Sequence, residues 1–140
     1  MIVYRIARQE PAPFMVLNDD WYPAATWQNQ PGRWMKDNST IKIISPHNGT
    51  FNLSFYAGSF NQKMNLSVYI NNKLIGIFSI DPIGPGNSLP THIVMNITLN
   101  KGENILRFQA PQLISELSIA DKLQGGQTIR IGFQNITLTQ

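Results

Sequence analysis

The chain has 140 residues, of which 42% are hydrophobic and only 14% are charged, and it contains no cysteine. The absence of cysteine excludes a disulfide framework, thiolate zinc ligation and thiol catalysis. The net charge of +3 is spread thinly, and no run of basic residues indicates binding to nucleic acid or to an anionic membrane surface. A chain of this length suffices for one domain with its own core.

The N-terminus predicts neither a secretory signal nor a membrane span. Arg5 interrupts the short apolar stretch from Met1 to Ile6, and no cleavage site of small residues follows. No apolar run approaches the ~20 residues that span a bilayer. If the domain lies outside the membrane, we expect it to be part of a longer membrane protein or to be exported by a signal that has been removed.

An aromatic segment without a clear strand pattern comes first along the chain. A loop of about twenty residues is uncommon in a compact domain unless it is functional or packed by its own side chains. Trp and Tyr rings stack on the apolar faces of sugars, and a neighbouring Arg can donate to hydroxyl groups. The segment is therefore a candidate carbohydrate platform, formed by Trp21, Tyr22, Trp27, Arg33 and Trp34.

The alternative for this segment is that its rings only pack against the domain and so hold the loop across one open end of the fold. Both roles can hold for different rings. Trp34 is framed by Arg33 and Met35 just before a strand, so we expect it to pack inward. Trp21 or Trp27 is then expected to remain accessible.

Alternation of apolar and polar residues runs through most of the remaining chain and predicts strands with one buried face. Ile41 and Ile43 open the first of these strands, and the pattern returns over residues 51–55, 64–70, 93–99 and 129–133. The parity of these strands predicts a core that contains Phe51, Leu53, Phe55, Leu66, Val68, Ile93, Ile97, Ile131 and Phe133.

Turn residues separate the strands. Residues 71–73 (Asn-Asn-Lys) and 100–103 (Asn-Lys-Gly-Glu) are predicted to close hairpins. Residues 81–90 hold three prolines and two glycines and cannot lie within a sheet interior. Only residues 112–123 could carry a helical turn or two. The pattern predicts an all-β chain that forms one domain over residues 1–140, an antiparallel two-sheet β-sandwich of the jelly-roll, galactose-binding-like type.

Asparagines that begin the N-glycosylation motif Asn-x-Ser/Thr are frequent. With fourteen asparagines and seventeen serines and threonines in the chain, chance pairing gives only about two such motifs. The chain has six, at Asn38, Asn48, Asn52, Asn65, Asn96 and Asn135. The excess indicates a surface that meets a glycosylation machinery, although a charge-poor β-protein also uses Asn and Thr on its outer faces.

Strand parity predicts which of these asparagines are exposed. Asn52, Asn65 and Asn96 occupy polar positions of their strands, where an attached glycan would point into solvent. Asn135 shares the parity of Phe133, so it is exposed only if a bulge shifts the register there.

The chain offers little for catalysis. His47 lies in a Pro-His-Asn-Gly turn and His92 at the start of a strand, and neither has a carboxylate near it in sequence. Asp19 and Asp20 could act as a general acid or as calcium ligands, but adjacent carboxylates in an Asn-Asp-Asp-Trp turn are usually capping or solvated groups. There is no nucleophile elbow, phosphate-binding loop or metal-spaced cluster. We therefore expect a domain that is not an enzyme on its own and needs no cofactor.

Six short motifs occur in an order that resembles a known family. They are Trp21-Tyr22-Pro23, Arg33-Trp34-Met35, and residues 57–60 (AGSF), 68–73 (VYINNK), 101–108 (KGENILRF) and 130–136 (RIGFQNI). Together, from about Trp21 to Leu138, they resemble the extracytoplasmic domain of membrane glycosyltransferases of the dolichyl-phosphate-mannose-dependent type in archaea and some bacteria.

The resemblance implies a jelly-roll, carbohydrate-binding-like fold that lies C-terminal to a membrane-embedded catalytic region outside this chain. The family often has a Glu soon after Trp-Tyr-Pro and an Asp shortly before the final Arg strand. Here Ala24 and Ala25 follow Pro23, and Asp121 lies nine residues ahead of Arg130. Roles of those acids are therefore not carried over to this chain.

Three roles follow as alternatives. The first is a non-catalytic accessory domain of a mannosyltransferase-like membrane enzyme at the cell surface. Its partners would be a glycan, a lipid-linked sugar or an acceptor, together with the membrane-embedded region of the same polypeptide. The second is a free-standing carbohydrate-binding module or surface-layer protein. The third is a glycan lyase on a jelly roll, which requires His47 or His92 to converge with Asp or Arg.

The glycosylation prediction can be tested by mass spectrometry of the protein from its native host. We expect glycopeptides that contain at least one of the six sequons, because strand parity turns several of them to solvent. Unmodified peptides across all six would contradict the prediction and would remove the sequence argument for an extracytoplasmic location.

Overall fold

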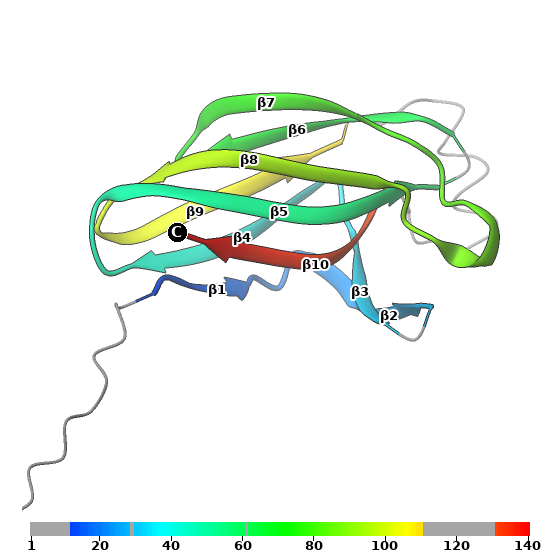
Figure 1. The fold of residues 1–140 in the computed structure, drawn as a ribbon, viewed down its shortest axis with the longest axis horizontal. Helices are drawn as coiled ribbons and strands as arrows, with labels where there is room; N and C mark the ends of the chain where they lie inside the picture. Colours follow the sequence, from blue (N-terminus) through cyan, green and yellow to red (C-terminus); the bar gives the residue numbers. More distant parts are fainter. Residues whose placement is uncertain (1–11, 29, 61, 111–130) are drawn as a thin grey trace, which may run out of the picture.

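The computed structural model describes residues 12–28, 30–60, 62–110 and 131–140, which form a sandwich of two five-stranded sheets (Figure 1). All strand pairings within the two sheets are antiparallel. The predicted fold class is therefore confirmed. No helix in the described part of the chain is long and apolar enough to cross a membrane.

The first sheet has the strand order β1-β4-β9-β6-β7, and the second has the order β2-β3-β10-β5-β8. The strands of the first sheet are β1 (Phe14–Leu17), β4 (Asn38–Ser45), β9 (Gly102–Gln109), β6 (Met64–Ile70) and β7 (Lys73–Ile80). Those of the second are β2 (Trp21–Trp27), β3 (Gln30–Met35), β10 (Ile131–Thr139), β5 (Gly49–Ser59) and β8 (Thr91–Leu99). A short 3₁₀ turn, η1 (Pro85–Asn87), lies in the proline-rich loop between β7 and β8.

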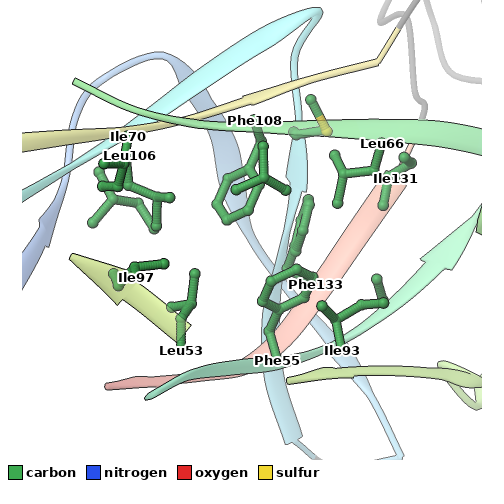
Figure 2. Close-up of a cluster of buried hydrophobic side chains, with 14 of the residues drawn as sticks. Leu53, Phe55, Leu66, Ile70, Ile93, Ile97, Leu106, Phe108, Ile131 and Phe133 are labelled. Atoms are coloured by element: carbon green, nitrogen blue, oxygen red, sulfur yellow. The ribbon is translucent and has the colours of Figure 1, made fainter. Parts of the chain in front are cut away.

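The core lies between the sheets and follows the predicted parity. At its centre Phe108 of β9 packs against Phe55 of β5 and Phe133 of β10, with ring centroids 5.4 and 4.8 Å apart (Figure 2). Each of the nine predicted core residues is at most 8% exposed. The register is therefore confirmed for Phe51, Leu53, Phe55, Leu66, Val68, Ile93, Ile97, Ile131 and Phe133.

The first predicted hairpin is confirmed. Asn71 and Asn72 alone connect β6 to β7, with φ values of 48° and 67°. Positive φ at both central residues is the geometry that matches the twist of the flanking strands, and Asn tolerates it better than most residues. Asn71 also ties the hairpin to β9, because its Oδ1 accepts from the Ile105 amide at 2.9 Å.

The second predicted hairpin is wrong, because the turn from β8 to β9 carries the chain from the second sheet to the first. The buried Asn104 holds this crossing. Its amide donates to the carbonyl oxygens of Asn100 (2.8 Å) and Gly102 (3.2 Å), and its Oδ1 accepts from the Asn100 amide (3.0 Å). Turn residues mark a chain reversal, but they do not specify which sheet the next strand joins.

The aromatic segment is not a loop, contrary to expectation, but forms β2 and β3. The β2 strand lies at the edge of the second sheet, where Pro23 is tolerated. Its register with β3 shifts between Trp21 and Ala24, which breaks the alternation that would have revealed a strand. The helical turns predicted at residues 112–123 lie outside the described residues, as do positions 129 and 130 of the last predicted strand.

The expected bulge in β10 is present. The pairing of β10 with β5 shifts between Gln134 and Thr137, and Asn135 has a φ of 53°. This shift turns Asn135 to solvent. All six sequon asparagines are exposed, including the three predicted from strand parity, Asn52, Asn65 and Asn96.

The burial pattern predicts different costs for one substitution at two strand positions. Ile97 is 1% exposed in the core, so Ile97→Ala should lower the free energy of unfolding by ~2–5 kcal/mol. Ile77 is 60% exposed on β7, so Ile77→Ala should cost less than about 1 kcal/mol. Urea denaturation of both variants measures the difference, and equal losses would contradict the assigned faces.

Candidate functional site

Trp21 is a core residue. It is 6% exposed, and its ring packs edge-to-face on Phe108 and Phe133 with centroids 6.0 and 5.5 Å apart. Its indole Nε1 donates to the Thr40 carbonyl oxygen at 2.9 Å, which ties β2 of the second sheet to β4 of the first. Trp21 therefore stabilises the sandwich and presents no face to a ligand.

Trp27 is also buried, at 6% exposure, but on the other side of the second sheet. Its ring lies on Gly32 of β3 and Gly132 of β10. A Cβ at Gly32 would come 2.3 Å from the Trp27 ring, and one at Gly132 would come 3.0 Å from it. Gly132 lies between two core residues of β10, so it faces outward. The glycines leave space for an indole to lie against the outer face of the sheet.

Trp27, Trp34, Ile83 and Leu89 form a small apolar group that we call the outer cluster. The Trp27 and Trp34 rings meet edge-to-face with centroids 5.2 Å apart. Ile83 and Leu89, from the loop between β7 and β8, cover Gly58, where an added Cβ would come within 2.7 and 2.9 Å of them. The outer cluster covers one end of the outer face of the second sheet.

The prediction of which tryptophan is buried and which is accessible is therefore wrong. Trp34, expected to pack inward, is the half-buried one, whereas both Trp21 and Trp27 are buried. Gly32 of β3 and Gly132 of β10 leave the space in which the Trp27 ring is buried. The alternative role, in which the rings pack, holds for Trp21 and Trp27.

Arg33 is the only formally charged residue in the five strands of the second sheet. Its Nη1 donates to the Tyr22 carbonyl oxygen at 3.2 Å, so two of the predicted site residues do lie together. Within the described ranges this is the one hydrogen bond of the guanidinium, which leaves its other N–H donors for a ligand. The Tyr22 ring lies 5.4 Å from Lys36 Nζ.

Arg33 lines a groove of about 290 Å³ beside β3 and the bulge of β10. Leu17, 37% exposed on β1 of the first sheet, forms part of its wall. The volume lies at the lower end of the ~300–1,000 Å³ that is usual for small-molecule sites, so the groove can take one small ring. The residues that line it are Leu17, Ala24, Pro31, Gly32, Arg33, Phe133, Gln134, Asn135 and Ile136.

Of the residues that line this groove, only Arg33 was predicted from the sequence to bind a ligand. Gln134 and Asn135 line it because the β10 bulge lies there. The sequence did contain a signal for the bulge, since Asn135 had the parity of a core residue. Leu17 was missed because β1 is short and shows no clear alternation.

Three of the residues considered for catalysis or metal binding, Asp20, His47 and His92, make structural contacts. Asp20 accepts from the amide and hydroxyl of Thr40, at 2.9 and 2.6 Å, and so joins the segment before β2 to β4. His47 stacks on Phe51, and His92 stacks on Tyr56. In the described part of the chain neither histidine contacts Asp or Arg, and no three metal-ligating side chains cluster. The convergence that a lyase would require is not found there.

The packing of Trp27 can be tested by substitution. Trp27→Ala should lower the free energy of unfolding by ~3–5 kcal/mol, as for other buried aromatic residues. Gly32→Ala should also destabilise, because its Cβ would overlap the same ring and the Phe133 carbonyl oxygen. Gly49→Ala is the matched control, since its nearest contact would be 3.3 Å, to His47. A fully stable Trp27→Ala variant would show that the ring does not pack.

Comparison with known proteins identifies solved structures that have the same fold. The sequence matches no protein-family model, and no curated protein matches it. A family 35 carbohydrate-binding module from an environmental isolate superposes with a TM-score of 0.60 at 8% identity, over 91% of this chain and 93% of that chain. The family 35 module from Paenibacillus barcinonensis gives 0.52 at 19% identity, over 93% and 99%.

An enzyme also contains this fold. An exo-β-1,3-galactanase from Phanerochaete chrysosporium, solved with β-1,3-galactotriose, superposes with a TM-score of 0.56 at 13% identity. The match covers 91% of this chain but only 29% of the galactanase. The chain therefore has the β-sandwich fold of the family 35 carbohydrate-binding modules.

Proposed function

We propose that this domain is a non-catalytic carbohydrate-binding module that holds one sugar residue in the groove beside Arg33. The observation that carries the proposal is the position of the guanidinium, which is the single charge in the strands of the second sheet. It lies at the wall of a groove whose other lining residues are apolar except for the amides Gln134 and Asn135. The fold shared with carbohydrate-binding modules supports a binding role over a catalytic one.

The chemistry of the groove suits a sugar ring. A planar guanidinium presents several N–H donors in a fixed fork, which can reach two neighbouring oxygens of one ligand. Its bond to the Tyr22 carbonyl oxygen restrains the side chain, so less conformational entropy is lost on binding. Pro31 and Leu17 offer apolar surface to the C–H groups of the same ring.

A module of this kind is expected to serve a larger protein. The galactanase contains its matching part as 29% of its chain, which supports attachment to an enzyme as one context for this domain.

The second candidate context is the extracytoplasmic part of a mannosyltransferase-like membrane enzyme. The motif order from Trp21 to Leu138 favours it, and the exposure of all six sequon asparagines is consistent with an extracytoplasmic location. An upstream reading frame that encodes many apolar spans would support this context, whereas an upstream or downstream hydrolase domain would favour the first.

Binding to a glycan array, followed by calorimetry on the best ligand, tests the proposal. Hydrogen bonds to a charged donor contribute ~1.5–3 kcal/mol, so Arg33→Met should weaken the affinity for that ligand by about 10- to 100-fold. Arg107→Met on the first sheet is the control, since its guanidinium lies over the Tyr69 ring, away from the groove. Unchanged affinity in Arg33→Met would rule out the groove as the site.

A further inference from the structure

The part of the second sheet that the outer cluster leaves uncovered has an unusual composition. On its outer face, β5, β8 and β10 contribute two aromatic rings, one valine, and otherwise only amide and hydroxyl side chains. We call this surface the open face. Its residues are Thr50, Asn52, Ser54, Tyr56, His92, Val94, Asn96, Thr98, Thr137 and Thr139.

Strand pairing fixes these residues in rows across the sheet. Tyr56 lies opposite His92, and Asn52 lies opposite Asn96. Ser54 lies between Val94 and Thr137, and its hydroxyl is 2.7 Å from that of Thr137. From Thr50 to Tyr56 the rows extend over ~20 Å along the strand. Nine of the ten residues are exposed, Tyr56 at 39% and Val94 at 57%, and Ser54 is half-buried.

The aromatic pair forms a rigid wall at one end of the open face. The Tyr56 and His92 rings are nearly parallel, with an interplanar angle of 8° and centroids 4.3 Å apart. Each ring uses one face for this contact, and Tyr56 remains 39% exposed. An immobilised tyrosine ring that is open to solvent offers an apolar face for stacking at little cost in side-chain entropy.

The open face contains no Asp, Glu, Lys or Arg, whereas the outer face of the first sheet does. That face has the Lys42–Glu103 ion pair and Arg107 stacked on Tyr69. A protein partner would favour an apolar centre on such a surface, yet Val94 is the only aliphatic residue here. An anionic ligand would find no cation. The composition instead matches a ligand that is neutral and rich in hydroxyl groups.

We propose that the open face is a second carbohydrate-binding surface, which takes a stretch of a neutral polysaccharide longer than the single ring that fits beside Arg33. Tyr56 stacks on one sugar, while the amides of Asn52 and Asn96 and the hydroxyls of the neighbouring rows bond to the others. The inference does not depend on the Arg33 groove, which lies at the bulge of β10 and uses different side chains.

This surface conflicts with glycosylation at two of the six sequons. Directly opposed residues of neighbouring strands have Cβ atoms ~4.5–5.5 Å apart, so a glycan on Asn52 or Asn96 would cover the rows around it. The proposal therefore requires both asparagines to be unmodified in the native protein. The exposed sequons outside the open face, such as Asn65 on β6, are unaffected.

Affinity electrophoresis of protein from a host without N-glycosylation tests the proposal. The probes are soluble galactan, mannan and β-glucan, with polygalacturonate as the charged comparison. We expect at least one neutral polymer to retard the wild type more than polygalacturonate does. Tyr56→Ala and Asn52→Asp should each weaken that binding by about tenfold or more. Asn65→Asp, the same change on the outer face of the first sheet, should leave it within about twofold.

Four results would overturn the proposal. They are the absence of retardation by every neutral polymer, preferential binding of polygalacturonate, full binding by both the Tyr56→Ala and the Asn52→Asp variants, and glycans on Asn52 or Asn96 in the native protein. Circular dichroism of each variant confirms folding. The groove is tested by Arg33→Met on the best ligand of the glycan array, and this surface is tested by Tyr56→Ala and Asn52→Asp on a polymer, so failure of one is distinct from failure of the other.

Discussion

The contact of Phe108 with Phe55, Phe133 and Trp21 is the constraint on which the rest of the structure depends. Phe108 is the one ring of this group that comes from the first sheet, and it fixes the inner faces of both sheets. Once Phe55 and Phe133 point inward, the pleat turns their neighbours Tyr56, Gln134 and Gly132 outward. Both proposed binding surfaces therefore depend on the same core register.

Properties that are encoded locally could be predicted from the sequence. Alternation identified the core because each strand has one buried face, and the side-chain period of two leaves no other register that buries Leu66 together with Val68. Two consecutive asparagines identified the β6–β7 hairpin because few other residues accept positive φ. Asn135 even marked the β10 bulge, since a polar residue at a core position requires the register to shift.

Properties that depend on distant partners could not be predicted. The turn that ends at Gly102 resembles a hairpin in sequence, but the side chain of Asn104 binds the chain where it crosses between the sheets. Trp27 looked like an accessible platform because its burial depends on Gly32 and Gly132, far from it in sequence or on another strand. Tyr56 and His92, 36 residues apart by their numbering, meet only because β5 pairs with β8.

The glycines also determine which part of the outer face of the second sheet is covered and which part is open to a ligand. Gly58 and Gly132 are paired and accept the loop and the tryptophans of the outer cluster, so that end of the face is apolar and covered. Two residues before Gly58, Tyr56 is 39% exposed, and the open face begins there. Arg33 of β3 lines the groove, and β5, β8 and β10 contribute no charged side chain to the open face. The two proposed sites therefore belong to one sheet: a groove with a single charge and a neutral surface that is long enough for an extended chain.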